Sequence, residues 1–323
     1  MPSADNPTPS GQDAPWKFAH VTDIHIGSER SFRFNPAFND NWETARRQIM
    51  DLNPDLLLVG GDIARDGSIH DFEFANSCAS IDEAGIPWHV IPGNMDTGNK
   101  VTELDGPWTE RDDPSLNVTE ELLENFRQRV RPFPWTFLHR GIRFSGFYEI
   151  VTGTELPTDL EARRWLEELA TLPPARRHIM LNHYPLFVHE PDEVAYDLTD
   201  KDHYHDWYFG LDPEPRRFLM DAYRKANVTH VLSGHIHCRR PPIEVDGIVY
   251  CKGPSTAFPQ FGDHFPDGDD TLGFLVFTVA EDTVTPEFVP LEKVSRRTDA
   301  RGPGGHPKPE ARIYGGHQER DGN

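Results

Sequence analysis

Short apolar runs alternate with amphipathic segments in the first hundred residues of the chain. The runs Trp16–Val21, Pro54–Val59 and Ile86–Pro92 are typical of strands, and the second is continuously apolar, as in strands buried on both faces. Between them, Phe38–Leu52 and Asp71–Ala84 carry apolar residues every three to four positions, which predicts helices. This order predicts βαβ units with parallel strands. The carboxyl ends of such strands meet at one edge of the sheet, where α/β proteins bind ligands.

The pattern breaks twice in the rest of the chain. Residues 97–132 are acidic and turn-rich, with one helix expected near Thr119–Arg129, and we interpret them as an insertion over the site. Residues 187–211 are rich in His, Asp and aromatic residues and are expected to form a long functional loop. The remaining strands are expected at 135–139, 142–150, 177–181, 228–232, 243–251, 273–279 and 283–289, and helices at 158–171 and 213–226.

We therefore expect one α/β domain over residues 16–294. The polar N-terminus (1–15) and the Gly/Pro/Arg/His-rich tail (295–323) are expected to be disordered. The net charge of −21, from 53 acidic and 32 basic residues, argues against general binding to nucleic-acid backbones. No apolar run approaches about 18 residues and the N-terminus does not resemble a secretory signal, so we expect no membrane span and a cytoplasmic location. The sequence does not predict the oligomeric state.

Residues with metal-ligand chemistry follow five of the apolar runs. They are Asp23 and His25, Asp62, Asn94, His183, and the pair His235 and His237. Each one alone is consistent with a polar turn, but together they suit borderline divalent ions such as Mn, Fe or Zn. Seven ligands exceed the needs of one ion and fit two ions about 3.5 Å apart that share a bridging carboxylate.

These motifs resemble the five blocks of the calcineurin-like metallophosphoesterases, in the same order from about residue 17 to 290. The blocks are Asp23-Ile24-His25, Gly61-Asp62, Gly93-Asn94-x-Asp96, His183 and Gly234-His235-Ile236-His237. The resemblance implies a four-layer α/β/β/α sandwich with mixed sheets. It also implies that one metal ion is bound by Asp23, His25 and His237 and the other by Asn94, His183 and His235, with Asp62 bridging both. The implied reaction is hydrolysis of a small phosphodiester or phosphomonoester by a hydroxide held between the ions.

The branch of the family is partly indicated by what is missing. Purple acid phosphatases carry a Tyr ligand three residues after the bridging Asp, where this chain has Arg65. The Asp-x-Val-Asp-Arg-Gly run of the Ser/Thr protein phosphatases is absent from residues 62–67. The chain therefore resembles the small phosphoesterase and cyclic-nucleotide phosphodiesterase branch. Its Trp207-Tyr208-Phe209 segment is also similar to a branch of small cytosolic phosphatases.

The main departure from the family is at Met95. The family usually reads Gly-Asn-His-Asp or Gly-Asn-His-Glu there, and that His is thought to stabilise the transition state or protonate the leaving oxygen. Methionine can do neither. Besides Asp62 and Asn94, the resemblance implies Asp96 and Arg65 as catalytic candidates: Arg65 would contact phosphate, and Asp96 would hold a loop or a metal-bound water. A replacement acid from the second insertion would be His189, His203 or His205.

Two other interpretations of the sequence remain open. Met95 and the aromatic loop from Tyr196 to Phe209 are also consistent with a catalytically weak or inactive relative that binds a protein partner. A purely structural metal module is the second alternative. In the enzyme reading, the acidic first insertion would repel long polyanions, which favours a small phosphate-ester substrate.

Overall fold

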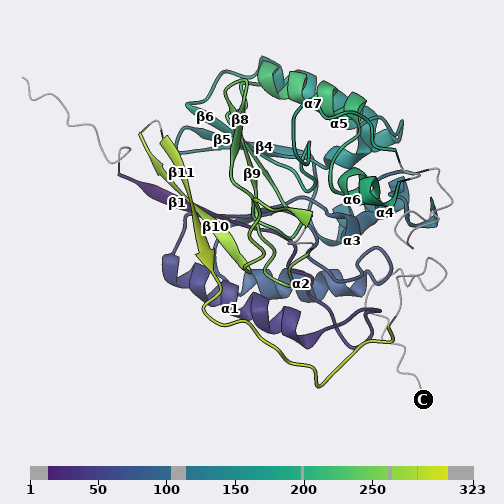
Figure 1. Cartoon of the computed structure of the whole chain (residues 1–323). Helices are drawn as coiled ribbons and strands as arrows, with labels where there is room; N and C mark the ends of the chain where they lie inside the picture. The colour runs from purple at the N-terminus through teal and green to yellow at the C-terminus, as the bar shows by residue number, and fades with distance from the viewer. Residues whose placement is uncertain (1–13, 103–113, 198–199, 261–263, 282, 305–323) are drawn as a thin grey trace, which may run out of the picture.

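Two mixed β-sheets pack face to face, and helices cover the outer face of each (Figure 1). The computed structural model describes residues 14–102, 114–197, 200–260, 264–281 and 283–304. The first sheet has the order β11 (Thr283–Pro290), β10 (Gly273–Ala280), β1 (Trp16–Val21), β2 (Leu56–Val59), β3 (Trp88–Val90). The second has the order β4 (Trp135–His139), β5 (Ile142–Gly146), β6 (Arg177–Leu181), β7 (His230–Ser233), β9 (Ile248–Lys252), β8 (Ile243–Val245). The predicted α/β/β/α sandwich with mixed sheets is confirmed.

The centre of each sheet is parallel, as the βαβ pattern predicts. In the first sheet β1, β2 and β3 are parallel, with Phe18 opposite Leu56 and Leu57 opposite Trp88. In the second, β5, β6, β7 and β9 are parallel. The antiparallel strands β11, β10, β4 and β8 complete the sheets at their sides. The segment expected as one strand at 243–251 is a hairpin, because Asp246 and Gly247 adopt positive φ and turn the chain.

Alternating side chains along the strands build two separate cores. Phe18 of β1 points between the sheets, where its ring stacks on Phe277 at 4.7 Å and meets the edge of Phe144 at 5.2 Å. The neighbouring residues Ala19 and Val21 point outward, into the core that also holds residues of the covering helices. Figure 1 shows α1 (Pro36–Leu52) and α2 (Phe72–Asp82) on one side, and α5 (Pro157–Thr171) and α7 (Pro213–Lys225) on the other.

The two insertions contain more regular structure than the sequence pattern predicts. The short helix α3 (Asn94–Thr97) leads into the first insertion, which holds the 3-10 turn Pro114–Leu116 and the expected helix, α4 (Glu120–Arg129), while its residues 103–113 lie outside the described residues. A second 3-10 turn spans Glu149–Val151. The prediction of a structureless loop at 187–211 is wrong in its second half, where Lys201–Phe209 form α6. Tyr204, Trp207 and Tyr208 recur at helical spacing and are buried in a small core of their own.

The start of the predicted disordered tail is held against the domain. The backbone N–H of Ser295 donates to Asn41 at 2.7 Å, Arg297 pairs with Asp40 at 2.9 Å, and these contacts tie the segment to α1. The rest of the two termini predicted to be disordered, residues 1–13 and 305–323, lies outside the described residues. Within the described part of the chain, no helix has the length and apolar character needed to cross a membrane.

Candidate metal centre

The candidate ligands meet because five loops leave the two sheets at neighbouring edges. These loops follow β1 (Asp23, His25), β2 (Asp62), β3 (Asn94), β6 (His183) and β7 (His235, His237). The loops after β1 and β2 stay paired beyond the strands, because the backbone N–H of Asp23 donates to Gly61 at 3.1 Å and that of His25 to the carbonyl of Asp62 at 2.9 Å. The backbone alone therefore sets Asp23 and His25 beside Asp62.

Most of these residues have a left-handed backbone, which is rare for residues with a side chain. The φ values are 55° for Asp23, 47° for His25, 52° for Asp62, 67° for His235 and 51° for His237. Such conformations cost about 1–3 kcal/mol each and gather at functional sites, although Asp and His tolerate them better than most residues. Five of the seven candidate ligands thus lie in tight turns at the ends of the strands.

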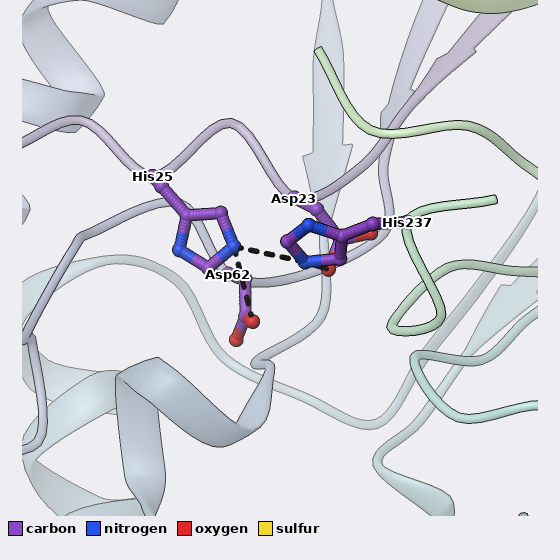
Figure 2. A group of neighbouring side chains, drawn as sticks. All are labelled: Asp23, His25, Asp62 and His237. Atoms are coloured by element: carbon purple, nitrogen blue, oxygen red, sulfur yellow. Dashed lines mark hydrogen bonds and ion pairs between the residues drawn. The ribbon is translucent and has the colours of Figure 1, made fainter. Parts of the chain in front are cut away.

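Two carboxylates and two imidazoles form the first group of ligands, and Figure 2 shows them turned toward one another. Nε2 of His25 lies 3.1 Å from Nε2 of His237 and 3.6 Å from Oδ2 of Asp62. Nε2 of His237 lies 3.2 Å from Oδ1 of Asp23. All four residues are buried, and their ligand atoms lie within 4.8 Å of one another. This group is compact enough to surround one ion.

A second group lies on the other side of Asp62. Oδ1 of Asn94 is 3.0 Å from Nε2 of His183 and 2.9 Å from Nδ1 of His235. Nε2 of His183 is also 3.5 Å from Oδ1 of Asp62. Asp62 thus directs Oδ2 to the first group and Oδ1 to the second, which is the arrangement expected of a bridging carboxylate.

Backbone carbonyls determine which nitrogen of three rings faces the site. The outer nitrogens donate to carbonyls in three contacts: His183 to Gly60 at 2.7 Å, His235 to Tyr208 at 3.1 Å, and His237 to Phe258 at 2.9 Å. A neutral imidazole has a single N–H, so the neutral form of each ring carries its lone pair on the inner nitrogen. Outer contacts of this kind orient histidines that bind metals.

Hydrogen-bond acceptors therefore face one another across the centre. In its neutral form the ring of His237 points a lone pair at Oδ1 of Asp23, a buried oxygen that accepts no hydrogen bond. The amide nitrogen of Asn94 donates to Asn99 at 3.1 Å and to the hydroxyl of Tyr208 at 3.2 Å, so its oxygen faces the two rings of the second group. Facing lone pairs repel, and a metal ion or a proton between them removes that repulsion. The residues present fit two divalent ions of the Mn, Fe or Zn class.

Burial and the neighbouring charges shift the protonation of these ligands. Burial raises the pKa of Asp62, and the charge of Asp23 raises it further. Burial also raises the pKa of Asp23, but His237 and the other imidazoles outweigh it and hold this pKa well below its usual range. Burial is the main cause that lowers the pKa of His25 and of His235. These two rings are neutral at pH 7 and keep a lone pair for a metal ion.

A cavity of about 80 Å³ adjoins the ligands and is lined by two arginines as well as Met95. Nη1 of Arg65 lies 3.4 Å from Nδ1 of His25, and Nη2 of Arg33 lies 3.7 Å from Sδ of Met95. Burial and the charge of Arg33 lower the pKa of Arg65 to about 10, so Arg65 stays charged at neutral pH. Guanidinium groups bind oxyanions well. The cavity is therefore lined both by candidate metal ligands and by two positively charged arginines.

The carboxylate of Asp96 accepts hydrogen bonds from the backbone around the metal centre. It accepts N–H groups of Gly93 at 2.9 Å, of Ile63 at 3.3 Å and of Ala64 at 3.1 Å. Burial and the charge of Asp62 raise its pKa to about 7. This side chain joins the loops that follow β2 and β3, in line with the loop-holding role expected for it, and its catalytic role stays a prediction.

Four contributors to the site were missing from the sequence-based set: Arg33, Glu149, Tyr208 and Phe258. Glu149 accepts the backbone N–H of His183 at 3.0 Å and so positions that ligand. The aromatic richness of the second insertion was the one signal that pointed to the segment holding Tyr208. The three histidines considered as replacement acids, His189, His203 and His205, are not among the residues that line the cavity.

Comparisons with known proteins agree with this geometry. Residues 17–239 match the family model described as calcineurin-like phosphoesterase. The chain is 29% identical over 306 residues to the serine/threonine-protein phosphatase CPPED1 of Danio rerio, covering 88% of this chain and 87% of that protein.

Two solved structures share the fold. GAP50, described as the anchor in the inner membrane complex of Plasmodium, superposes with a TM-score of 0.58 and 14% identity, covering 89% of each chain. A dimetal phosphatase from Danio rerio superposes with a TM-score of 0.52 and 13% identity, covering 84% of this chain and 95% of the other. At these identities the likeness concerns the fold alone.

Proposed function

The chain belongs to the calcineurin-like phosphoesterase family and is a phosphoric ester hydrolase, and we propose that it cleaves small phosphate esters at a centre of two divalent metal ions. The observation that carries this proposal is the set of lone pairs that face one another across the centre. His237 faces an oxygen of Asp23 that accepts no hydrogen bond, and two further rings face the oxygen of Asn94. A metal ion in each half would relieve that repulsion.

The assignment of ligands follows the two groups. Asp23, His25 and His237 would hold one ion, and Asn94, His183 and His235 the other, with Asp62 between them. When bound, such ions supply Lewis acidity and lower the pKa of water near the phosphorus atom. The chain's own residues then have to bind the phosphoryl group, neutralise its charge and assist the leaving oxygen.

The two arginines that line the cavity are suited to binding the phosphoryl group and neutralising its charge. Arg33 and Arg65 reach the same cavity as the ligands, and Arg65 is 6% exposed, so little water competes for it. Buried guanidinium groups form strong, charge-assisted hydrogen bonds with phosphate oxygens. We assign both arginines to the nonbridging oxygens of the substrate.

The positive charge of these two arginines favours a phosphate monoester over a diester as the substrate. A phosphate monoester carries up to two negative charges, whereas a diester carries one, and two arginines beside two metal ions match the larger charge. The related Danio rerio protein is named a serine/threonine-protein phosphatase, which is also a monoesterase activity. A cytoplasmic location and a small substrate remain part of the proposal.

The test compares the two ester classes under controlled metal loading. Protein stripped of metal is reloaded with Mn²⁺, Fe²⁺ or Zn²⁺ and assayed with p-nitrophenyl phosphate and with bis-p-nitrophenyl phosphate, with Asp62→Ala as the matched blank. We expect hydrolysis that requires metal, favours the monoester and is lost in the blank. Full activity without metal would contradict the two-metal centre, and a preference for the diester would contradict the substrate assignment.

Met95 supports one alternative, a relative that binds a partner and has little catalytic activity. The side chain of Met95 lines the cavity at the position where the family usually carries a histidine that can act as an acid. Methionine cannot donate a proton. Metal binding without turnover of either ester would favour this alternative over the enzyme.

A further inference from the structure

Three potential ligands gather around α6, outside the centre described above. They are His189, Asp206 of α6 and His264, from segments that lie far apart in the sequence. Oδ1 of Asp206 lies 3.0 Å from Nε2 of His189 and 2.7 Å from Nε2 of His264. The residues that line the cavity of the metal centre do not include any of the three.

The distances in this cluster resemble those in the second ligand group of the metal centre. There, Oδ1 of Asn94 faces two imidazole nitrogens at 2.9 and 3.0 Å, and here a single oxygen of Asp206 faces two imidazole nitrogens at closely similar distances. Within the described residues, Asp206 has no lysine or arginine as an ion-pair partner. Among the described residues, the carboxylate of Asp206 is contacted by two imidazoles, and a carboxylate with two imidazoles is a donor set that binds zinc-class cations.

The ligands are also held in place and remain accessible. The backbone N–H of His189 donates to Glu193 at 3.0 Å, and Glu193 is held by the nearly fully buried Arg216 at 3.1 Å. The ring of His264 packs edge-on against Phe265 at 4.8 Å. The side chains of His189, Asp206 and His264 are 39%, 15% and 25% exposed, so an ion and a water molecule can enter from solvent.

We propose that His189, Asp206 and His264 bind one further divalent ion of the zinc class, separate from the catalytic pair. Two imidazole nitrogens, one carboxylate oxygen and a water molecule complete the tetrahedral set that zinc prefers. The ion would cross-link the segment after β6, α6 and the segment around residue 264.

That cross-link bears on the metal centre through a backbone carbonyl of α6. Tyr208, two residues after Asp206, accepts the outer N–H of His235. By fixing α6, the third ion would help to hold the carbonyl that orients this ligand.

The experiment counts zinc ions bound to the full-length chain. Metal-stripped wild type, Asp206→Asn and His264→Gln are titrated with Zn²⁺ by calorimetry, and bound zinc is measured by mass spectrometry after gel filtration. The matched control is His203→Gln, an exposed histidine of α6 outside the cluster. We expect each cluster variant to bind one zinc ion fewer per chain than wild type, and the control to bind as many as wild type.

Equal stoichiometry in wild type and the cluster variants, or a third ion bound only above about 100 μM zinc, would overturn the proposal. If Asp206→Asn does not fold, His189→Gln replaces it, because that ring is well exposed. Asp62→Ala separates this proposal from the proposed function. It should lose ions of the catalytic centre and keep the ion at the cluster, and loss of the cluster ion in Asp62→Ala would contradict a separate site.

Discussion

Nη2 of Arg33 lies 3.7 Å from Sδ of Met95, at the wall of the cavity that adjoins the metal ligands. Methionine stands where relatives of this family usually carry a histidine, and the guanidinium of Arg33 occupies the neighbouring space. A positive charge is thus present beside the place where a protonated imidazole would act. Arg33 can stabilise negative charge there, but a guanidinium does not release a proton near neutral pH.

Arg33→Ala is expected to lower kcat/KM for p-nitrophenyl phosphate by about 10- to 100-fold, the size of one charge-assisted hydrogen bond. Metal content should not change, because Arg33 is not a ligand. The matched control is Arg30→Ala, on the same loop, whose exposed guanidinium stacks on Phe72 at 4.1 Å. Steady-state kinetics of the two variants check this, and equal kcat/KM values would remove Arg33 from the site.

Met95→His is expected to raise turnover of an ester with a poor leaving group, such as phenyl phosphate, by at least about 10-fold. General acid catalysis is worth roughly 10²–10⁴-fold, and a reaction with a poor leaving group gains most from it. Met95→Leu controls for the change of shape. Turnover of metal-loaded Met95→His that equals wild type would show that the reaction needs no acid at this position.

The sheets and the candidate ligands were largely predictable from the sequence. An apolar run that ends in a polar turn identifies both a buried strand and the edge where its ligand lies, so the structure brings Asp23, His25 and Asp62 together as the pattern predicts. The helix α6 was not predictable as such, because its aromatic residues are buried against a local core built from segments that lie far apart in the sequence.

The arginines that line the cavity, and the backbone carbonyls that orient the histidine ligands, could not be predicted from the sequence. Arg33 reaches Met95 across 62 positions of sequence from an irregular loop that has no periodic pattern. The carbonyls of Tyr208 and Phe258 orient two ligands, and a backbone carbonyl leaves no signal in a sequence. These features depend on tertiary contacts between loops, on which hydrophobic periodicity carries no information.

A buried acid should make the stability of the protein depend on pH. Glu73 accepts the hydroxyl of Ser31 and the backbone N–H of Asp66, and burial together with the charge of Asp66 raises its pKa to about 8 from 4.5. Between pH 4.5 and 8 the folded state therefore keeps a proton that the unfolded chain has released. The free energy of unfolding should fall as pH rises through this window, by up to about 1.4 kcal/mol per pH unit.

Glu73→Gln should remove this part of the pH dependence, because the amide stays neutral and the hydroxyl of Ser31 can accept its N–H. Urea unfolding at pH 5, 6, 7 and 8 measures the effect as the difference between variant and wild type. Glu83→Gln, at the exposed end of the same helix, is the control. Wild type and Glu73→Gln curves that run parallel over the whole range would contradict the prediction.

Tyr208→Phe tests how the second ligand group is oriented. The hydroxyl of Tyr208 accepts from the amide nitrogen of Asn94 at 3.2 Å, which keeps the amide oxygen turned toward His183 and His235. Phenylalanine keeps the ring beside His235 and the backbone carbonyl that holds it, and it removes the hydroxyl that accepts from Asn94. Loss of such an outer contact typically weakens metal binding 10- to 100-fold, so we expect half-maximal hydrolysis to need about 10-fold more metal.

The value of kcat at saturating metal distinguishes a loss of ligand orientation in Tyr208→Phe from a general disruption of the site. At saturating metal, kcat should return to within about twofold of wild type, because the hydroxyl acts on affinity and not on the reacting atoms. Tyr204→Phe is the matched control, since its buried ring stacks on Tyr208 at 6.1 Å from the same helix. A kcat that stays low at every metal concentration would place the hydroxyl in contact with the substrate, and an unchanged metal requirement would show that Asn94 is held by Asn99 alone.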